Sequence, residues 1–353
     1  MSVMDHKCQN CSAKLVFNPK KQKWVCDYCG SEYGLDDLKK NNEKETAENY
    51  IKKGAKKASN ISYNSYNCPD CGAEIIMDEN TSVTECVYCG NTAIIMERLV
   101  GEFKPEQIIP FKKDKSDAIN TFLAYKKGKI FMPKDFISKK NIEKISGVYI
   151  PFYLYDMDTS ASVKVEATRV KNWTDREYRY KRTDYFDAIR SGDMSFSKIP
   201  TDASKKFPDD IMDSIEPYEY RELVDFDASY MSGFLSEKYD LTDDELKDRA
   251  KKRAEQTAIQ ELVDDVSGYD FKTLKYSSAN SVIVSSKYVL LPVWMLNVKY
   301  NDTIYTLAMN GQTGKFIGNV PISKKKIAIF WFELFLIVSL IVIAISLIGY
   351  IVK

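Results

Sequence analysis

Histidine is almost absent from this chain of 353 residues, and His6 is the single example. Acyl transfer through a Ser–His or Cys–His pair needs an imidazole held beside the nucleophile. His6 lies two residues before Cys8 near the start of the chain, where we expect it to be solvated. A G-x4-G-K-[ST] phosphate-binding loop is also lacking. These absences argue against histidine-dependent hydrolases and P-loop ATPases, and we expect that the chain is not an enzyme.

An excess of charge of one sign is lacking too, since 51 basic residues stand against 50 acidic ones. No global field therefore draws the chain to nucleic acid or to anionic lipid. The first 30 residues are polar, so we expect no secretory signal peptide. Any binding to a charged partner must come from a local surface.

One long hydrophobic run, residues 327–352, stands near the C-terminus and contains a single charge, Glu333. At about 1.5 Å per residue such a helix can cross a hydrocarbon layer roughly 30 Å thick. A buried helix of a soluble protein is the alternative, but such helices are rarely apolar on every face. Lys324, Lys325 and Lys326 precede the run, and lysines beside a membrane span favour the cytosolic side. We expect a single-pass tail anchor in the cell membrane, with the N-terminus in the cytoplasm.

The eight cysteines fall into two copies of one pattern, C-x2-C-x14-C-x2-C, and the copies are offset by 60 residues. The same offset relates Tyr28 to Tyr88 and Gly30 to Gly90, so the pattern is an internal repeat. The first quartet is Cys8, Cys11, Cys26 and Cys29, and the second is Cys68, Cys71, Cys86 and Cys89.

This spacing is typical of structural metal sites. Two C-x2-C turns face each other across a hairpin and complete a tetrahedral sulfur cage. Sulfur ligands select zinc over hard cations, with iron as the chief competitor. Gly30, Gly72 and Gly90 directly follow a second cysteine, where glycine tolerates the positive φ of the turn. Disulfides are the alternative, and a reducing cytosol disfavours them.

We therefore predict two structural zinc ions, because four protein ligands leave no open position for water. Each module is too small for a core of its own, so its folding should depend on metal. A strong chelator is accordingly expected to unfold residues 1–95 and to leave the later domain intact.

Charge distinguishes the possible partners of the two zinc ribbons. Residues 1–34 contain five lysines and three acidic residues, a net of +2, whereas residues 60–100 contain one arginine and six acidic residues, a net of −5. Phosphate binding needs Lys or Arg for counterion release. The second ribbon cannot supply it, so we expect the ribbons to dock proteins.

The fold class that we predict is small β zinc ribbons plus an α+β domain with a mainly antiparallel sheet and a C-terminal transmembrane helix. The predicted boundaries are zinc ribbon 1 at 1–34, a charged linker at 35–67, zinc ribbon 2 at 68–100, the α+β domain at 101–320 and the transmembrane helix at 327–352.

Local patterns within 101–320 predict individual elements. Helices are expected near 116–125, 207–215 and 243–266, the last with a Thr242–Glu245 capping box. Strands are expected at 147–155, 160–170, 269–277, 281–285, 287–300 and 303–309. Asp156 and Asp158 form a D-x-D pair at an expected hairpin turn, and no third acid has metal-site spacing.

Basic and aromatic residues alternate around a second expected turn, 172–175. Residues 169–182 contain six basic and two acidic residues, and Tyr178 and Tyr180 lie among them. Proteins that bind single-stranded nucleic acid use such interleaving. The alternative interpretation of this alternation is a charged outer face that keeps an exposed strand from aggregating, and we favour that alternative.

The order of motifs resembles a known family. The two cysteine ribbons are followed by IIPF at 108–111, GVYIPF at 147–152, LLPVW at 290–294 and NGQTG at 310–314, and then by the hydrophobic run. This order is similar to that of bacterial double-zinc-ribbon, tail-anchored membrane proteins, which are often labelled primosomal-like or replication-helicase-like. The resemblance implies association with membrane-stress proteins of the PspA and SPFH types.

From these observations we expect a membrane-anchored zinc-ribbon adaptor that recruits protein partners to the inner membrane face. Analogy with the family places that role in a membrane-stress response. The alternative is a membrane-tethered nucleic-acid-binding protein that uses the 169–182 segment.

Overall fold

The computed structural model describes most of the chain. The described residues are 3–4, 7–39, 64–67, 74–77, 81–85, 92–95, 104–133, 135–136, 142, 144–301 and 303–351.

The protein is a sheet-rich α+β structure with mostly antiparallel strands, in agreement with the predicted class. Eleven of the described strands form one sheet, in the order β1-β8-β7-β13-β10-β14-β15-β16, with β11 beside β10, β9 beside β14 and β12 beside β9. Its strands are β1 (Val3–Met4), β7 (Thr81–Glu85), β8 (Thr92–Ile95), β9 (Gln107–Ile108), β10 (Ser146–Asp175), β11 (Tyr178–Asp202), β12 (Val224–Asp225), β13 (Leu235–Glu237), β14 (Phe271–Tyr300), β15 (Thr303–Asn310) and β16 (Phe316–Gly318).

Two smaller sheets and several helices complete the fold. The small sheets are β2 (Leu15–Asn18), β3 (Lys23–Cys26) and β4 (Glu32–Tyr33), and the pair β5 (Asn64–Asn67) and β6 (Glu74–Met77). The helices are α2 (Lys115–Lys127), α4 (Asp209–Ser214), α5 (Asp243–Asp265) and α6 (Lys324–Ile351), with short 3-10 turns η3 (Tyr220–Glu222) and η4 (Ala228–Met231).

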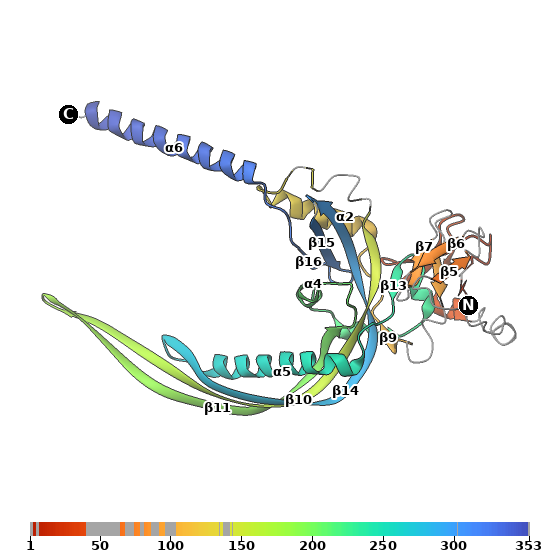
Figure 1. Ribbon diagram of the computed structural model, residues 1–353, viewed down its shortest axis with the longest axis horizontal. Helices are drawn as coiled ribbons and strands as arrows, with labels where there is room; N and C mark the ends of the chain where they lie inside the picture. The colour runs from red at the N-terminus through yellow and green to blue at the C-terminus, as the bar shows by residue number, and fades with distance from the viewer. Residues whose placement is uncertain are drawn as a thin grey trace.

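Strands β10, β11 and β14 form a long curved blade that extends from the body (Figure 1). The predicted break between 155 and 160 is wrong, because β10 runs without interruption from Ser146 to Asp175. The separate strands predicted between 269 and 300 are likewise one strand, β14. A shift in register beside Tyr155, where β10 pairs with β11, stands where the turn was expected.

Asp156 is accommodated inside the strand because the neighbouring strands supply its hydrogen bonds. The hydroxyls of Ser197 and Ser285 donate to its carboxylate at 2.8 and 2.7 Å, and the backbone N–H of Lys198 donates at 2.9 Å. Carboxylates that accept several hydrogen bonds remain ionised in partly buried positions. The pKa of Asp156 accordingly lies below its usual value, although partial burial opposes this shift. The D-x-D pair therefore lies within a continuous strand of the blade, and no turn forms there.

Helix α5 covers the concave face of the blade (Figure 1). Its predicted bounds and its capping box are confirmed, since the N–H of Thr242 donates to the carboxylate of Glu245 at 2.7 Å. The predicted apolar stripe is buried on the sheet, and three of its members are alanines, which let the helix approach the strands closely. The buried residues are Leu246, Ala250, Ala254, Ala258 and Leu262, and those facing the last two on β10 include Ala161, Val163, Val165 and Ala167.

Replacing Ala258 with leucine should destabilise the protein by about 1–3 kcal/mol, since added methylenes in a packed core force strain. Ala258 is fully buried between α5 and the blade. The matched control is Gln256→Leu on the exposed side of the same helix, where we expect a change within about 0.5 kcal/mol. Denaturant unfolding followed by circular dichroism measures both. Equal effects of the two substitutions would contradict the close packing of α5.

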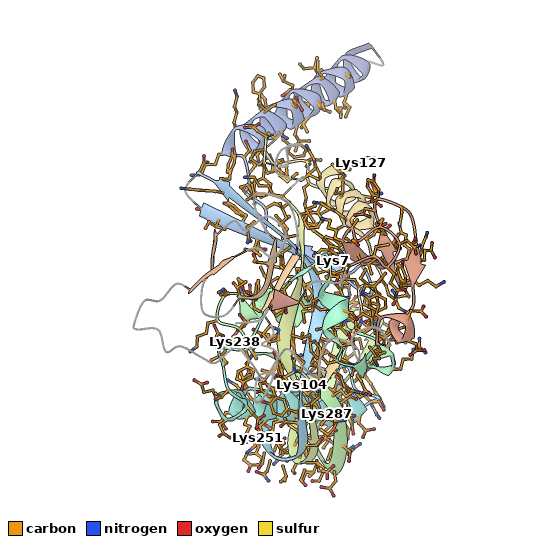
Figure 2. The ribbon with its side chains drawn as sticks, turned by 90° about the vertical axis from the view of Figure 1, so that its right-hand side faces the viewer. Lys7, Lys104, Lys127, Lys238, Lys251 and Lys287 are labelled. Atoms are coloured by element: carbon orange, nitrogen blue, oxygen red, sulfur yellow. The ribbon has the colours of Figure 1, made fainter. Side chains whose placement is uncertain are left out.

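Helix α6 stands clear of the body, and its side chains project on all sides (Figure 2). None of the side chains described in Lys324–Ile345 is buried, and this stretch is long and apolar enough to cross a membrane. Among the described helices it is the one with these properties. The prediction of a C-terminal apolar helix is thus confirmed by length and composition.

Candidate metal centre

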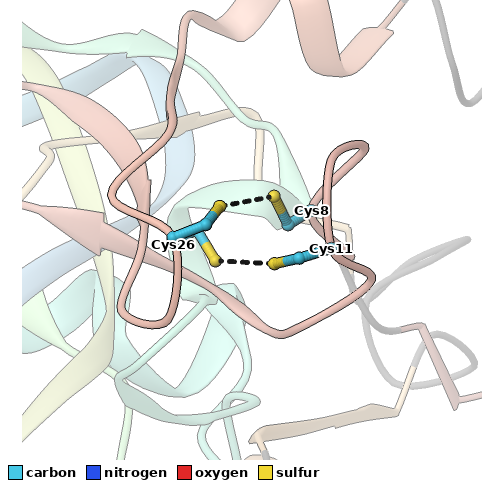
Figure 3. Close-up of side chains that lie close together, drawn as sticks. Cys8, Cys11 and Cys26 are labelled. Atoms are coloured by element: carbon cyan, nitrogen blue, oxygen red, sulfur yellow. Dashed lines mark hydrogen bonds between the residues drawn. The ribbon is translucent and has the colours of Figure 1, made fainter.

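The first cysteine quartet lies at one end of the small sheet β2–β3–β4. Strand β3 ends at Cys26, and the turn from Cys8 to Cys11 precedes β2. The register pairs Leu15 of β2 with Cys26, so the hairpin brings both C-x2-C turns to the same end. Figure 3 shows Cys8 and Cys11 facing Cys26 across the gap between the turns.

The two turns have the same backbone geometry. In the first, the N–H of Ser12 donates to the carbonyl of Cys8 at 2.8 Å, and in the second, the N–H of Gly30 donates to that of Cys26 at 2.9 Å. Gly30 has a φ of 73°, which confirms the expected positive φ at this glycine. Ser12 takes the equivalent position in the first turn with a φ of 59°. A glycine after the second cysteine therefore predicts the positive φ only in the second of these two turns.

The four thiols are arranged as a metal site requires. The Sγ atoms of Cys8 and Cys29 are 3.5 Å apart, as are those of Cys11 and Cys26, and all four lie within 4.8 Å of one another. A tetrahedron with Zn–S bonds of about 2.3 Å has edges of about 3.8 Å. A disulfide would need about 2.05 Å between sulfurs. The cluster could therefore bind a metal ion, and the four predicted residues are brought together.

Two thiols of the cluster have neighbours that favour the thiolate. The hydroxyl of Tyr33 lies 3.3 Å from the Cys8 sulfur, and this contact is the main reason that the pKa of Cys8 is lowered to about 6. The hydroxyl of Ser31 lies 3.1 Å from the Cys29 sulfur and, with the Ser31 N–H, lowers the pKa of that thiol. The thiolate is the form that binds metal.

The pKa of a third thiol in the cluster, that of Cys11, is shifted in the opposite direction. The backbone N–H of Ala13 favours the Cys11 thiolate, yet burial and the neighbouring sulfurs of Cys29 and Cys26 raise the pKa of Cys11 to about 12. Several negative sulfurs cannot crowd together without a compensating positive charge. A divalent cation at the centre would supply that charge, so the four sulfurs could bind a metal ion.

The second quartet, Cys68, Cys71, Cys86 and Cys89, lies outside the described residues. Strands that flank it are described: β6 follows Cys71, and β7 ends just before Cys86. β7 pairs with β13, so this part of the chain joins the main sheet. A second zinc ribbon stays a prediction.

The small sheet packs against the body through its aromatic side chains, a contact that our sequence reasoning missed. The indole N–H of Trp24 donates to the carbonyl of Ser229 at 2.7 Å. The rings of Phe17 and Tyr230 lie 5.0 and 5.1 Å from that of Trp24. Phe17 and Trp24 are each only 1% exposed. Two such large rings in a module too small to bury them are the signal that could have predicted this docking.

An ion pair fastens the same module to α2. Lys20 lies 2.7 Å from Asp114 and 3.3 Å from Asp117, and Asp114 caps the N-terminus of that helix. Partial burial opposes ionisation of Asp114, but Lys20 and the N–H of Asp117 hold the pKa of that carboxyl well below its usual range. The cysteine module (residues 7–34) is thus held to the body by both apolar and charged contacts.

These features define a class of protein: a sheet-rich α+β structure with an N-terminal cysteine cluster that could bind a metal ion and a C-terminal helix apolar enough to cross a membrane. The chain is 36% identical over 331 residues to the uncharacterized protein YdjG of Bacillus subtilis (strain 168), and the match covers 94% of each chain. This chain belongs to the same family as YdjG. No family model matches it, and no solved structure matches it.

Proposed function

We propose that this protein is a membrane-anchored adaptor that recruits protein partners to the cytoplasmic face of the cell membrane. The observation that carries the proposal is the contrast between α6 and the body. The body buries its own core, whereas no described side chain of Lys324–Ile345 is buried. An apolar helix left in water would expose a large hydrophobic surface, which soluble monomers rarely do.

The orientation follows from charge and from thiol chemistry. Lys324, Lys325 and Lys326 begin α6, and basic residues beside a membrane span favour the cytoplasmic side. The cytoplasm is reducing, so the cysteines remain available to a metal. We assign zinc to the first quartet and, by the sequence repeat, a second structural zinc to the other.

The cysteine module offers one exposed aromatic side chain to a partner. Tyr28 is 84% exposed and lies between Cys26 and Cys29, in the second metal-binding turn. The opposite side of the module is buried against the body through Trp24. Exposed tyrosines held on a rigid scaffold are frequent energetic centres of protein interfaces. Tyr88 stands at the equivalent position of the repeat.

The proposed role is non-catalytic. Charged residues that gather inside the described body are paired with one another: Arg249 lies 2.8 Å from Asp202, and Arg253 lies 2.8 Å from Glu216. These pairs hold α5 to the end of β11 and to the chain that follows α4. By the family resemblance, the partners that we propose are membrane-stress proteins of the PspA and SPFH types, with this chain acting as their scaffold.

Substituting Tyr28 with alanine should reduce partner recovery from membranes while leaving the fold intact. A hot-spot tyrosine is worth about 2 kcal/mol or more, so recovery should fall roughly 30-fold at limiting concentration. The measurement is quantitative mass spectrometry after affinity purification of the full chain from solubilised membranes. Deleting residues 1–95 is less informative, because it would also expose the surface that Trp24 covers.

The matched control is Tyr185→Ala, which removes another highly exposed tyrosine from the blade. Its partner list should equal that of the unsubstituted protein. If Tyr28→Ala also leaves the list and the yields unchanged, the cysteine module does not dock partners through this turn.

A further inference from the structure

The blade ends in a hairpin whose last residues, 171–182, we call the blade tip (Figure 1). Its register places Trp173 opposite Tyr180, and Asp175 opposite Tyr178. Alternate residues of a strand share a face, so these three aromatic side chains stand together on one side of the tip. This side continues the face of β10 that α5 covers nearer the body, where Val163 and Val165 are buried.

The three aromatic rings of the blade tip are exposed. Trp173 is 49% exposed, Tyr178 67% and Tyr180 43%, although the indole and the Tyr180 ring stack with centroids 5.4 Å apart and planes 12° from parallel. Helix α5 ends at Asp265 and covers only the nearer part of the blade. A group of exposed rings at the end of a protruding element indicates a contact surface.

Basic residues flank these rings along the chain, with Arg179 and Lys181 on the opposite face of the hairpin from the two tyrosines. Residues 171–182 contain five basic and two acidic residues, which leaves a net charge of +3. Arg182 is paired with Asp184 at 2.7 Å. Arg176, Arg179 and Lys181 form no ion pair with any residue that the structure describes, so their charges are available to an anionic partner. The rest of the chain is nearly neutral, so the positive charge is a local feature of the tip.

The location of the blade tip favours one kind of anionic partner. The blade and α6 project from the same side of the body (Figure 1). A helix inserted in a bilayer holds the whole chain at the membrane, and such tethering makes even a weak second contact effective. Trp and Tyr prefer the interface between headgroups and acyl chains, and each nearby Lys or Arg adds attraction to anionic lipid.

We propose that the blade tip is a second membrane contact that binds anionic phospholipid headgroups, with its rings in the interface and its arginines and lysine at the phosphates. The inference rests on the proposed anchoring by α6. Single-stranded nucleic acid is a different partner for the same residues. It is less well matched, because Trp173 and Tyr180 stack on each other and each therefore offers only one face to a base.

Tryptophan quenching tests the contact in the full-length protein. The chain is reconstituted into vesicles with brominated acyl chains, made of phosphatidylcholine alone or with 30% phosphatidylglycerol. Subtracting the emission of Trp173→Phe from that of the unsubstituted protein isolates Trp173 from the other tryptophans, Trp24, Trp294 and Trp331. We expect the Trp173 emission to be quenched in the anionic vesicles and much less in the neutral ones.

Charge removal at the tip should abolish the effect. Replacing Arg176, Arg179 and Lys181 with glutamine should weaken surface partition by roughly 100-fold, at about 1 kcal/mol per basic residue. Quenching should then fall to the level seen in neutral vesicles. The matched control removes three exposed or half-exposed basic residues elsewhere, by Arg221→Gln, Lys251→Gln and Lys252→Gln, and should leave the quenching unchanged.

Flotation of the same vesicles separates this inference from the proposed anchoring. If the protein floats but Trp173 is not quenched in anionic vesicles, the lipid contact is wrong and the anchor stands. If the protein does not float, the anchoring is wrong and the inference fails with it. If a single-stranded oligonucleotide changes the Trp173 emission in neutral vesicles and anionic lipid does not, the tip is a nucleic-acid site instead.

Discussion

Removing the zinc that we propose at the first cysteine cluster should destabilise the body as well as the cysteine module. Cys26 ends the strand that carries Trp24, and Trp24 and Phe17 are buried in the main core. Opening the cluster frees the hairpin and withdraws both rings from that core. Truncating a buried Phe or Trp costs about 3–5 kcal/mol each, so together they approach the whole stability of a typical domain.

The experiment compares the full-length protein with Cys26→Ser and with a zinc chelator. Thermal unfolding in detergent is followed by near-ultraviolet circular dichroism, and bound metal is counted by mass spectrometry. We expect two zinc ions in the unsubstituted protein and one in Cys26→Ser, with a strongly lowered unfolding midpoint. Ser12→Gly is the matched control, since it changes the same module, keeps the positive φ and removes no ligand.

This expectation replaces the one based on spacing alone, in which a chelator unfolds residues 1–95 and leaves the later domain intact. The packing of Trp24 on Ser229 and Tyr230 is the reason for the change. If the metal is released and the midpoint of the body does not move, the module and the body are energetically independent, as the cysteine spacing alone predicts.

Placing two lysines in the middle of α6 should release the protein from membranes. Val338 and Ile341 lie near the centre of Lys324–Ile351, and both are exposed. A lysine at the centre of a membrane span costs about 2.5–3.5 kcal/mol, so Val338→Lys with Ile341→Lys shifts insertion by roughly 10⁴-fold. Val338→Leu with Ile341→Leu is the matched control and should insert normally.

Fractionation of washed membranes measures the distribution of each variant between pellet and supernatant. The unsubstituted chain and the leucine variant should remain in the pellet until detergent is added, whereas the lysine variant should not. Protease treatment of intact cells should leave the N-terminal body uncut. Recovery of the unsubstituted chain in the soluble fraction, or cleavage of its body from outside, would contradict the proposed anchor and its orientation.

Features that depend on neighbours within a few residues were predicted well. The capping box of Thr242 and Glu245, the stripe of small residues on α5 and the apolar length of α6 are all local patterns. The first cysteine quartet belongs with them. Its ligand spacing is set by two short turns, and a hairpin of paired strands is enough to bring the turns together.

The blade was predicted less well, because its strands depend on distant partners. An aspartate at position 156 reads as the end of a strand when only its neighbours in sequence are considered. Its carboxylate is satisfied by Ser197 and Ser285, which lie 41 and 129 residues away. No local pattern contains that information, so two predicted short strands turned out to be one long one.

The sequence by itself determined the helices, the apolar run and the first cysteine cluster, which could bind a metal ion, because each is encoded in residue types at fixed short spacings. The tertiary structure alone decided that the cysteine module is part of the body's core and that the blade carries its aromatic tip on the side from which α6 projects (Figure 1). Both results depend on contacts between segments far apart in the chain, such as Trp24 with Ser229. Those contacts form only in the complete fold, where apolar side chains are removed from water and buried polar groups find hydrogen-bond partners.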